Sequence, residues 1–310
     1  LKISLINGIR RTIISDIPTY AIHKETINFI VNSGIFDNSY LTLRLGLIPI
    51  QSDLKNINYD AVELEFHAKN ETEYIQSYYC RDFTGDTQVF AYPETLFTKL
   101  KPNEELHLVC KLQKDNGVTN GGCFSPVCNA SYKFKLDQKQ IEKESADMSA
   151  EEKQSFNTLE AKRLYLKNKD GQPSVYEMTL ENCGNYDNKT IMSFGMDILK
   201  LKLIQLSDEI KHKNKDKFKI SLGNNKFESY DIELYNENDT IGNLLTSYML
   251  DDKNVKFCGY KIPHPLKKIL IIRISLVKDN TMNNVLKLIH NTIEHLVKMI
   301  DTMKKEWKKL

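Results

Sequence analysis

The spacing of apolar residues predicts helices and strands from the start of the chain. Apolar side chains recur at helical spacing from Leu5 to Ile13, and Pro18 ends this first helix. Residues 19–32 then predict a strand, and residues 41–45 a short helix before the break at residues 46–49. The first part of the chain therefore combines both kinds of element.

The middle of the chain changes character twice. Runs of β-branched and aromatic residues, separated by turn signals such as Asn120-Gly121-Gly122, predict a β-rich module over residues 60–135. Residues 137–172 are instead highly charged and contain good helix formers, which is typical of a solvated helical connection. A strand over residues 174–182 follows.

The last part of the chain predicts the order strand, strand, helix, strand, strand, helix. It is preceded by a helix over residues 192–211 and by the basic linker 211–217. One face of that helix carries Leu199, Leu203, Leu206 and Ile210. The first two strands predict a hairpin across Asn224-Asn225, and Asp239 can cap the helix that comes next.

The closing helix carries the strongest pattern in the chain. Its apolar residues are spaced alternately by three and four positions, which is the a/d seam of a helix that packs against another helix. The seam consists of Leu286, Ile289, Ile293, Leu296, Ile300, Met303 and Trp307. Such a seam must be covered, and the helix near residues 196–212 is the obvious partner. Together these segments predict an α+β fold.

Composition narrows the class of protein. The chain has 310 residues, of which 41% are hydrophobic and 27% charged, so we expect a globular protein of two or three domains. The formal net charge of only +2 gives no argument for nucleic-acid binding. Six scattered cysteines favour a reducing compartment, and no apolar run approaches the roughly 20 residues of a membrane span. We therefore expect an intracellular protein without membrane contact. Because residue 1 is Leu rather than Met and the chain begins inside an apolar pattern, we also expect further sequence, including a first strand, before Leu1.

Two cysteine-containing stretches are candidates for chemistry. Cys123 with Cys128, or Cys258 with His264, could each form half of a zinc site, but neither pair has two further ligands at a suitable spacing. We therefore expect Cys258 to be a buried core residue and His264 a turn residue, with no metal and no cofactor. Phosphate-loop, dinucleotide, zinc-protease and nucleophile-elbow motifs do not occur, so we expect no catalytic site.

Three arginines stand out from the surrounding pattern. Arg10 and Arg11 on the first helix could grip a phosphate, although most such pairs are solvated faces or ion-pair partners. Arg44 lies in the otherwise apolar stretch LTLRLGLIPI, where a guanidinium needs a planar, bidentate partner. We therefore expect Arg44 to contact protein rather than solvent.

Two pairs of segments resemble one family. The stretch NGIRRTIISDIPTYAI followed by LRLGLIPI resembles the signature of α-like RNA polymerase subunits, namely bacterial α, archaeal D and the third-largest subunit of RNA polymerase II. The matching positions are Asn7, Arg10, Arg11, Pro18, Ala21, Arg44, Leu45, Gly46, Leu47, Ile48 and Pro49. The stretch NDTIGNLLTSYML followed by VKFCGYKIPHPL resembles archaeal L and the eleventh subunit of RNA polymerase II. Its matching positions are Asp239, Thr240, Gly242, Asn243, Leu244, Leu245, Gly259, Tyr260, Pro263, His264 and Pro265.

The resemblance spans nearly the whole chain and implies its organisation. Residues 1–55 and 173–212 would form a D-like dimerisation domain, residues 56–172 a β-rich insert, and residues 216–310 an L-like dimerisation domain. In the family, the two folds pair through their helices into a scaffold that nucleates assembly of the two large catalytic subunits. The resemblance thus implies a non-catalytic assembly subunit of a DNA-directed RNA polymerase, with both halves paired in cis.

The resemblance also implies partners and interface residues. The partners would be the two large subunits, chiefly the second-largest, and small zinc-bearing subunits, with little or no direct DNA contact. The interface residues would be Asn7, Arg10, Arg11, Arg44, Gly46, Pro49, Gly242, Asn243, Leu244, Leu286, Ile289, Ile293, Leu296 and Ile300. Of these, Arg10, Arg11, Arg44 and Gly46 would face the second-largest subunit. The helices over residues 196–212 and 281–307 would form the internal interface.

The chain departs from the family in its cysteines. Many D-like subunits carry a cysteine cluster for zinc or iron–sulfur in the insert, and the cysteines at 80, 110, 123 and 128 do not reproduce it, so the prediction of no metal stands. The fusion and the bias toward Asn, Lys and Ile resemble the proteins of large cytoplasmic DNA viruses. A viral origin implies that the protein is located in the viral factory in the host cytoplasm and in the virion, whereas a non-viral protein would be located in the nucleus. The alternative is a stand-alone metal-binding protein or hydrolase that uses Cys123, Cys128, Cys258 and His264.

Overall fold

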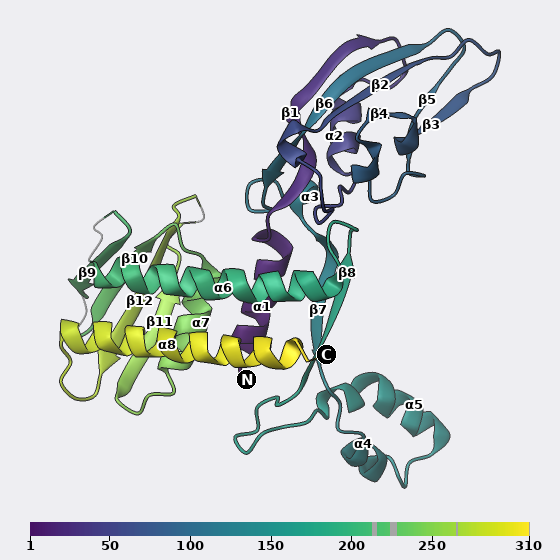
Figure 1. The fold of residues 1–310 in the computed structure, drawn as a ribbon. Helices are drawn as coiled ribbons and strands as arrows, with labels where there is room; N and C mark the ends of the chain where they lie inside the picture. The colour runs from purple at the N-terminus through teal and green to yellow at the C-terminus, as the bar shows by residue number, and fades with distance from the viewer. Residues whose placement is uncertain (213–215, 224–227, 265, 310) are drawn as a thin grey trace. The chain divides into compact units, whose positions relative to one another are not determined.

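The computed structural model describes residues 1–212, 216–223, 228–264 and 266–309 (Figure 1). Helices and strands are mixed along the chain, and the predicted α+β class is confirmed. In chain order the elements are α1 (Ile3–Ser15), β1 (Thr19–Asn32), α2 (Asn38–Gly46), β2 (Glu63–Lys69), β3 (Gln76–Tyr79), β4 (Thr84–Gly85), β5 (Leu96–Leu100), β6 (Glu105–Asp115), α3 (Gly121–Phe124), β7 (Val127–Phe134), α4 (Gln138–Glu144), α5 (Ala150–Leu159), β8 (Tyr176–Asn182), α6 (Asn188–Lys211), β9 (Phe218–Leu222), β10 (Tyr230–Tyr235), α7 (Asp239–Met249), β11 (Val255–Lys261), β12 (Ile269–Leu276) and α8 (Met282–Trp307), with short 3-10 helices at Tyr59–Ala61, Cys80–Asp82, Thr87–Val89 and Ala161–Arg163.

The chain forms two compact units. The first unit contains Leu1–Arg11, Ser131–Thr179 and Met196–Leu310, and the second contains Thr12–Ala130 and Leu180–Gly195. Both units are therefore discontinuous in sequence. The predicted boundaries of the D-like, insert and L-like domains stay a prediction.

The first unit is built around an antiparallel sheet with the strand order β11-β12-β10-β9. Alternate side chains of the two central strands are buried, including Ile232 and Leu234 on β10 and Ile272 and Ile274 on β12. Helices α7 and α8 contact this sheet, and Figure 1 shows α8 and α6 running side by side. Apolar alternation on one sheet face thus creates the surface that the helices cover.

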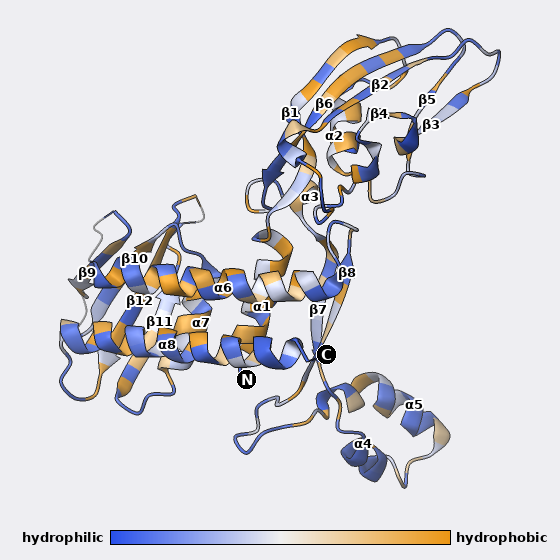
Figure 2. Cartoon of the chain, in the orientation of Figure 1, coloured by the Kyte–Doolittle hydropathy of each residue, from blue (hydrophilic) through white to orange (hydrophobic). Residues whose placement is uncertain are grey.

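The second unit contains a four-stranded antiparallel sheet with the order β1-β6-β2-β4, and a separate β3–β5 pair. Bands of hydrophobic and hydrophilic residues alternate along β1, β6 and β2 in Figure 2. Phe66 lies at the centre of the core, with its ring centroid 5.1 Å from those of both Phe83 and Phe97. The outward side chains of β2 and β6 are mostly polar, so one face of the sheet is packed and the other is exposed.

Residues 137–172 are more structured than a solvated connection. The predicted helical character is present in α4 and α5, but the segment also has a small core of its own, formed by Ile141, Phe156 and Ala161. These three side chains are only 5–9% exposed. The prediction missed this core because a cluster so small leaves little periodic signal in a charged sequence.

Helix starts are set by local side chains, and one prediction is off by a residue. The side chain of Asp37 accepts a hydrogen bond from the backbone N–H of Tyr40 at 2.7 Å and begins α2. Helix α7 is capped by Asn238, whose Oδ1 accepts from the Thr240 N–H at 3.0 Å, whereas Asp239 is the first helical residue. The predicted turn at 224–225, Pro265 and the middle of the basic linker lie outside the described residues.

Gly195 permits a close approach between α6 and α1. A Cβ atom at Gly195 would lie 2.5 Å from Cγ1 of Ile13, which is fully buried. We expect Gly195→Ala to lower the free energy of unfolding by about 1–2 kcal/mol, because overpacking outweighs the helix-propensity gain of about 1 kcal/mol. Urea denaturation measures the change.

Gly121→Ala is the matched control for this substitution. A Cβ atom there would meet nothing within 4 Å, so we expect stability equal to or above that of the wild type. A Gly195→Ala protein as stable as the Gly121→Ala protein would contradict the close approach.

Within the part of the chain that the structure describes, no helix is both long enough and apolar enough to cross a membrane.

Candidate subunit interface

Helices α1 and α7 run antiparallel to each other within the first unit. The Ser247 hydroxyl donates a hydrogen bond to the Ser4 hydroxyl at 2.6 Å, and the Lys2 ammonium donates to Asp251 at 2.5 Å. Further along α1, a Cβ atom at Gly8 would lie 3.7 Å from the Thr240 side chain. The start of α1 therefore meets the end of α7, and later residues of α1 meet its beginning.

Helices α6 and α8 form a second antiparallel pair. Lys200 forms an ion pair with Asp301 at 2.6 Å, and Lys304 forms one with Asp197 a turn away. Ser207 Oγ also lies within hydrogen-bond distance of a histidine on α8, at 2.8 Å from His290 Nδ1. The sequence positions of these partners rise on one helix as they fall on the other, which is the antiparallel arrangement.

Apolar side chains lie on the buried faces of both helices. The predicted face of α6 is confirmed, since its four residues are at most 6% exposed. Those of α8 include Ile289, Ile293, Leu296 and Ile300, each at most 2% exposed. Burial of each such side chain contributes about 1.5–3 kcal/mol, so apolar packing outweighs the partly exposed ion pairs, which contribute about 0–1 kcal/mol each.

The prediction of the α8 seam is wrong at its ends. Val285 is fully buried in place of Leu286, which is half-exposed, and Met303 and Trp307 are only partly buried. The buried stripe also includes Thr292 beside Ile293. This wider stripe follows the 3.6-residue period of a helix that packs against several elements, whereas the predicted seam assumes the 3.5-residue period of a coiled coil.

The two halves of the chain repeat one order of elements. Helix α7 is followed by β11, β12 and α8. Helix α1 is followed by β7, β8 and α6 in the same order, with the elements β1 to α3 inserted before β7, and α4, α5 and a 3-10 helix inserted between β7 and β8. Strands β7 and β8 pair with each other as β11 and β12 do. Each antiparallel helix pair therefore joins corresponding elements from the two halves.

The predicted interface residues of α1 are half-exposed. Arg10 Nε donates to Asn7 Oδ1 at 2.9 Å, one turn away on the same helix. Burial raises the pKa of Tyr260, and the negative charge of Asp239 raises it further. The positive charge of the nearby Arg11 lowers the same pKa. Contact of Arg10 and Arg11 with another subunit stays a prediction.

Arg44 contacts protein, as predicted, but its partners lie in the same chain. Its Nε donates to the carbonyl oxygen of Phe97 at 2.7 Å, and its Nη2 donates to that of Leu96 at 2.5 Å. The guanidinium thus connects α2 to β5 through two successive backbone carbonyls, which suits its planar fork.

We expect Arg44→Met to lower the free energy of unfolding by about 2–3 kcal/mol, because it removes both charged hydrogen bonds while keeping an apolar stem. Chemical denaturation measures the loss. Arg44→Lys is the control and should lose less, since it keeps the charge but cannot bridge both carbonyls. Wild-type stability of the Met variant would contradict these bonds.

The other predicted interface residues from the two motifs are also packed within their own unit. A Cβ atom at Gly46 would lie 3.4 Å from the carbonyl oxygen of Ile22, and the Pro49 carbonyl accepts from Ala91 N at 3.1 Å. A Cβ atom at Gly242 would lie 2.7 Å from the Tyr260 ring. Leu244 is fully buried and Asn243 is half-exposed. Their roles at an interface between subunits stay predictions.

The four proposed metal ligands do not converge. Cys258 is 7% exposed on β11, and burial raises its pKa to about 12. The exposed His264 accepts from the Leu266 N–H through Nδ1 at 3.1 Å, so it is a turn residue, as predicted. In the second unit, the Cys123 thiol donates to the Ile22 carbonyl at 3.6 Å, and that of Cys128 to the Glu181 carbonyl at 3.3 Å.

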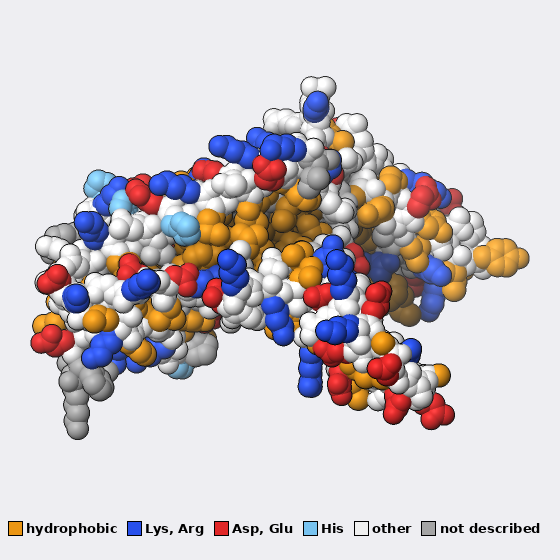
Figure 3. All heavy atoms as spheres, turned by 90° about the horizontal axis from the view of Figure 1, so that it is seen from below, with side chains coloured by type: hydrophobic (Ala, Val, Ile, Leu, Met, Phe, Trp, Pro, Cys, Tyr) orange, Lys and Arg blue, Asp and Glu red, His pale blue; other side chains and the backbone are white. Residues whose placement is uncertain are grey.

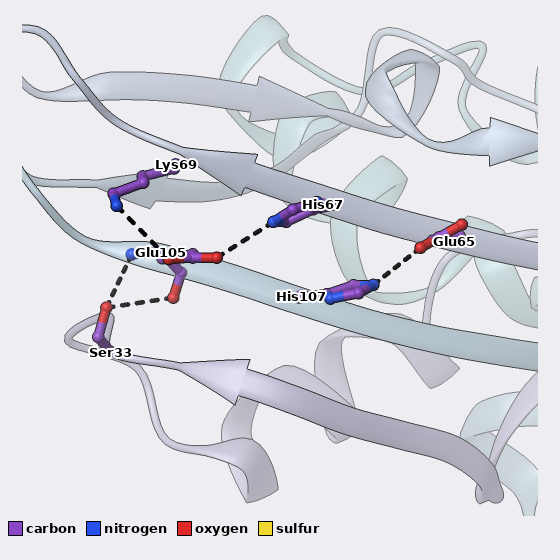
Figure 4. Close-up of polar contacts among 6 residues, drawn as sticks. All are labelled: Ser33, Glu65, His67, Lys69, Glu105 and His107. Carbon is purple, nitrogen blue, oxygen red and sulfur yellow. Dashed lines mark hydrogen bonds and ion pairs between the residues drawn. The ribbon is translucent and has the colours of Figure 1, made fainter.

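Two histidines that the sequence did not single out stack on the exposed sheet face of the second unit. His67 on β2 and His107 on β6 lie directly opposite each other, with ring centroids 4.4 Å apart. Figure 4 shows each imidazole pointing to a different carboxylate, His67 to Glu105 at 3.1 Å and His107 to Glu65 at 2.8 Å. Within the described ranges, no three or more His, Cys, Asp or Glu side chains are arranged to hold a metal ion. The four side chains come from β2 and β6, and they meet because the register of these two strands places His67 opposite His107.

Comparisons with known proteins identify the kind of interface. Residues 229–306 match the RNA polymerase Rpb3/Rpb11 dimerisation domain family. The chain is 34% identical over 77 residues to DNA-directed RNA polymerase II subunit RPB11 of Schizosaccharomyces pombe, covering 24% of this chain and 63% of RPB11. It is 26% identical over 242 residues to subunit RPB3 of the same yeast, covering 66% of this chain and 79% of RPB3.

A third relative spans nearly the whole chain. The putative DNA directed RNA polymerase subunit R470 of Acanthamoeba polyphaga mimivirus is 22% identical over 314 residues, covering 96% of this chain and 84% of the relative. The chain is similar to the α-like RNA polymerase subunits. Its match to RPB11 spans less than two thirds of that relative.

The chain carries likenesses to both RPB3 and RPB11, which confirms the predicted resemblance. The family match begins just before β10 and ends within the last turn of α8, so it contains α7 and α8. These helices supply one side of both antiparallel pairs. The alternative of a stand-alone metalloprotein or hydrolase has no support from these relatives or from the positions of its four residues.

Proposed function

We propose that this α-like subunit is the non-catalytic assembly platform of a multisubunit DNA-directed RNA polymerase. Its two halves pair in cis and together dock the two large catalytic subunits for DNA-templated transcription. The observation that carries this proposal is that α1 pairs with α7 and α6 with α8 inside one polypeptide. A scaffold built in this way forms independently of its concentration.

The proposal places the second-largest subunit as the chief partner, on a surface that includes α2. Leu43 and Leu47 on and beside this helix are 65% and 56% exposed, and Tyr40 is 44% exposed. These positions share one face of the helix, opposite the buried Leu41 and Leu45. An apolar stripe of this kind supports a protein contact. By the resemblance, Arg10, Arg11, Arg44 and Gly46 would also face this subunit.

The proposal also includes the small zinc-bearing subunits as neighbours and little or no direct contact with DNA. Basic and acidic side chains are interspersed over the face in Figure 3. The formal net charge of +2 agrees with this mixture. Both features support protein rather than nucleic-acid partners, since DNA affinity rests on concentrated positive charge.

We propose a viral origin for this single-chain arrangement, with the viral factory in the host cytoplasm and the virion as its locations. The mimivirus relative supports this, because one viral chain matches 96% of the length. The separate matches to RPB3 and RPB11 support a fusion of two kinds of half. A nuclear location is the alternative if the source is cellular.

Affinity purification of the tagged chain, co-expressed with the two large subunits of its own polymerase, tests the proposal. We expect both to co-purify with it. Charge substitutions at Leu43 and Leu47 should reduce recovery of the second-largest subunit. The matched control is Leu222→Asp, since Leu222 is 72% exposed on β9. Recovery of the chain alone would overturn the assembly role, and stoichiometric zinc in the purified chain would favour the metalloprotein.

A further inference from the structure

The pairing of β7 with β8 brings together two cysteines that are far apart in the sequence. The Cys183 N–H donates to the Pro126 carbonyl at 3.0 Å, which pairs these two residues across the strands. In this register Cys128 lies opposite Glu181, and its thiol donates to the Glu181 carbonyl at 3.3 Å. Cys183 is then one diagonal step from Cys128 on the same face of the ribbon, within reach of a side chain.

The two thiols are neighbours on one face of the ribbon. Burial raises the pKa of Cys183, and the nearby Cys128 thiol raises that pKa further. Cys128 is exposed to solvent and Cys183 is half-buried. The pair therefore joins one sulfur that small molecules can reach to a second sulfur held beside it.

The other four cysteines of the chain are placed differently. Cys80, Cys110 and Cys258 are buried, and burial raises their pKa values to about 11, about 12 and about 12. Cys123 is half-buried, and its thiol donates to a backbone carbonyl. Reactivity requires an accessible thiolate, so these four thiols are poor candidates for modification.

We propose that Cys128 and Cys183 form a redox-modification site that closes to a disulfide by exchange with a small-molecule disulfide such as oxidised glutathione. The Cys128 thiolate attacks one glutathione sulfur, which forms a mixed disulfide and releases one glutathione thiolate. Cys183 loses its proton to solvent and attacks the sulfur of Cys128, which expels the second glutathione. Two protein thiols are oxidised and one glutathione disulfide is reduced to two glutathione thiols.

Closure of this disulfide fastens the two ends of a long excursion of the chain. Residues 129–182, which include α4 and α5, lie between the two sulfurs. A cross-link that closes so long a loop restricts the unfolded chain more than the folded one, and thereby stabilises the fold. The site therefore couples the stability of the β7–β8 ribbon to the thiol–disulfide balance around the protein, which goes beyond the proposed assembly role.

Peptide mapping of the wild-type chain tests the proposal. The protein is equilibrated at increasing ratios of oxidised to reduced glutathione, quenched in acid, alkylated and digested with trypsin. We expect a linkage between peptides 115–133 and 170–189, with Cys123 in the first peptide still alkylated. Glutathione on Cys128 with Cys183 free at the most oxidising ratio, or a linkage through Cys123, would overturn the proposal.

Two variants and a second measurement complete the test. Cys183→Ser should abolish the linkage and leave glutathione on Cys128, whereas Cys123→Ser should leave the linkage unchanged. The oxidised wild type should melt several degrees above the reduced protein, and this difference should vanish in Cys183→Ser. Equal melting of the oxidised and reduced wild type would contradict the loop closure. All these measurements use the isolated chain, so their outcome is independent of polymerase assembly.

Discussion

Replacing Ile293 by Asp should lower the free energy of unfolding by about 4–5 kcal/mol, near the upper end for single substitutions. Ile293 is 2% exposed on the buried stripe of α8. The substitution removes apolar burial worth about 1.5–3 kcal/mol and places a carboxylate on the buried apolar stripe of the helix. Thermal and urea denaturation of the purified chain measure the loss.

Two controls separate the charge from the loss of burial. Ile293→Asn has the shape of the Asp variant without its charge and should cost less, whereas Asn291→Asp places the same charge at an exposed site and should change stability by less than about 0.5 kcal/mol.

The pH dependence gives a third readout for the same substitution. Burial favours the neutral form of the introduced carboxyl, so its pKa in the folded Ile293→Asp protein is raised above its unfolded value of about 3.9. The deficit should therefore be smallest below that unfolded pKa and grow as pH rises through it. Wild-type melting of Ile293→Asp would show that α8 is not packed as described.

Severing the chain between residues 212 and 216 should make its stability depend on protein concentration. In the intact chain the two halves meet at an effective concentration on the order of 1 mM, as for modules joined by a short linker. At about 1 μM protein, the separate halves should lose roughly 4 kcal/mol, because each tenfold dilution costs about 1.4 kcal/mol. The fragments 1–212 and 216–310 would be co-expressed, purified together and melted over a range of concentrations.

The control keeps the chain continuous at the same place. A flexible Gly-Ser insertion between residues 212 and 216 should leave melting independent of concentration, because lengthening a loop costs little free energy. Fragments that purify separately, or a severed protein whose melting does not change with dilution, would contradict pairing through α1 with α7 and α6 with α8.

The order of elements and the family could be predicted because their signals are local. Helical spacing and strand alternation recur within a few residues, so the buried face of α6 was predicted correctly from Leu199 to Ile210. The two motifs around Arg10 and Gly242 are short and continuous, and the relatives confirm the resemblance that they carry. The need of Arg44 for a protein partner also followed from its apolar neighbours alone.

The interface could be predicted only in outline. Periodicity placed an apolar stripe on α8 but favoured Leu286 over Val285, because a 3.5-residue seam and a 3.6-residue stripe differ by one position at the end of a helix. The ion pairs of Lys200 and Lys304 depend on how the two helices are aligned. This alignment cannot be predicted from the sequence of either helix by itself.

By itself, the sequence determined the α+β class of this protein and its likeness to the α-like RNA polymerase subunits. The tertiary structure alone decided that Arg44 bonds the carbonyls of β5, that His67 stacks on His107, and that Cys128 and Cys183 are neighbours on paired strands. The physical reason is the separation in sequence of the residues that interact. Helix and strand preferences arise between near neighbours, whereas these contacts depend on the register of segments that meet only in the folded chain.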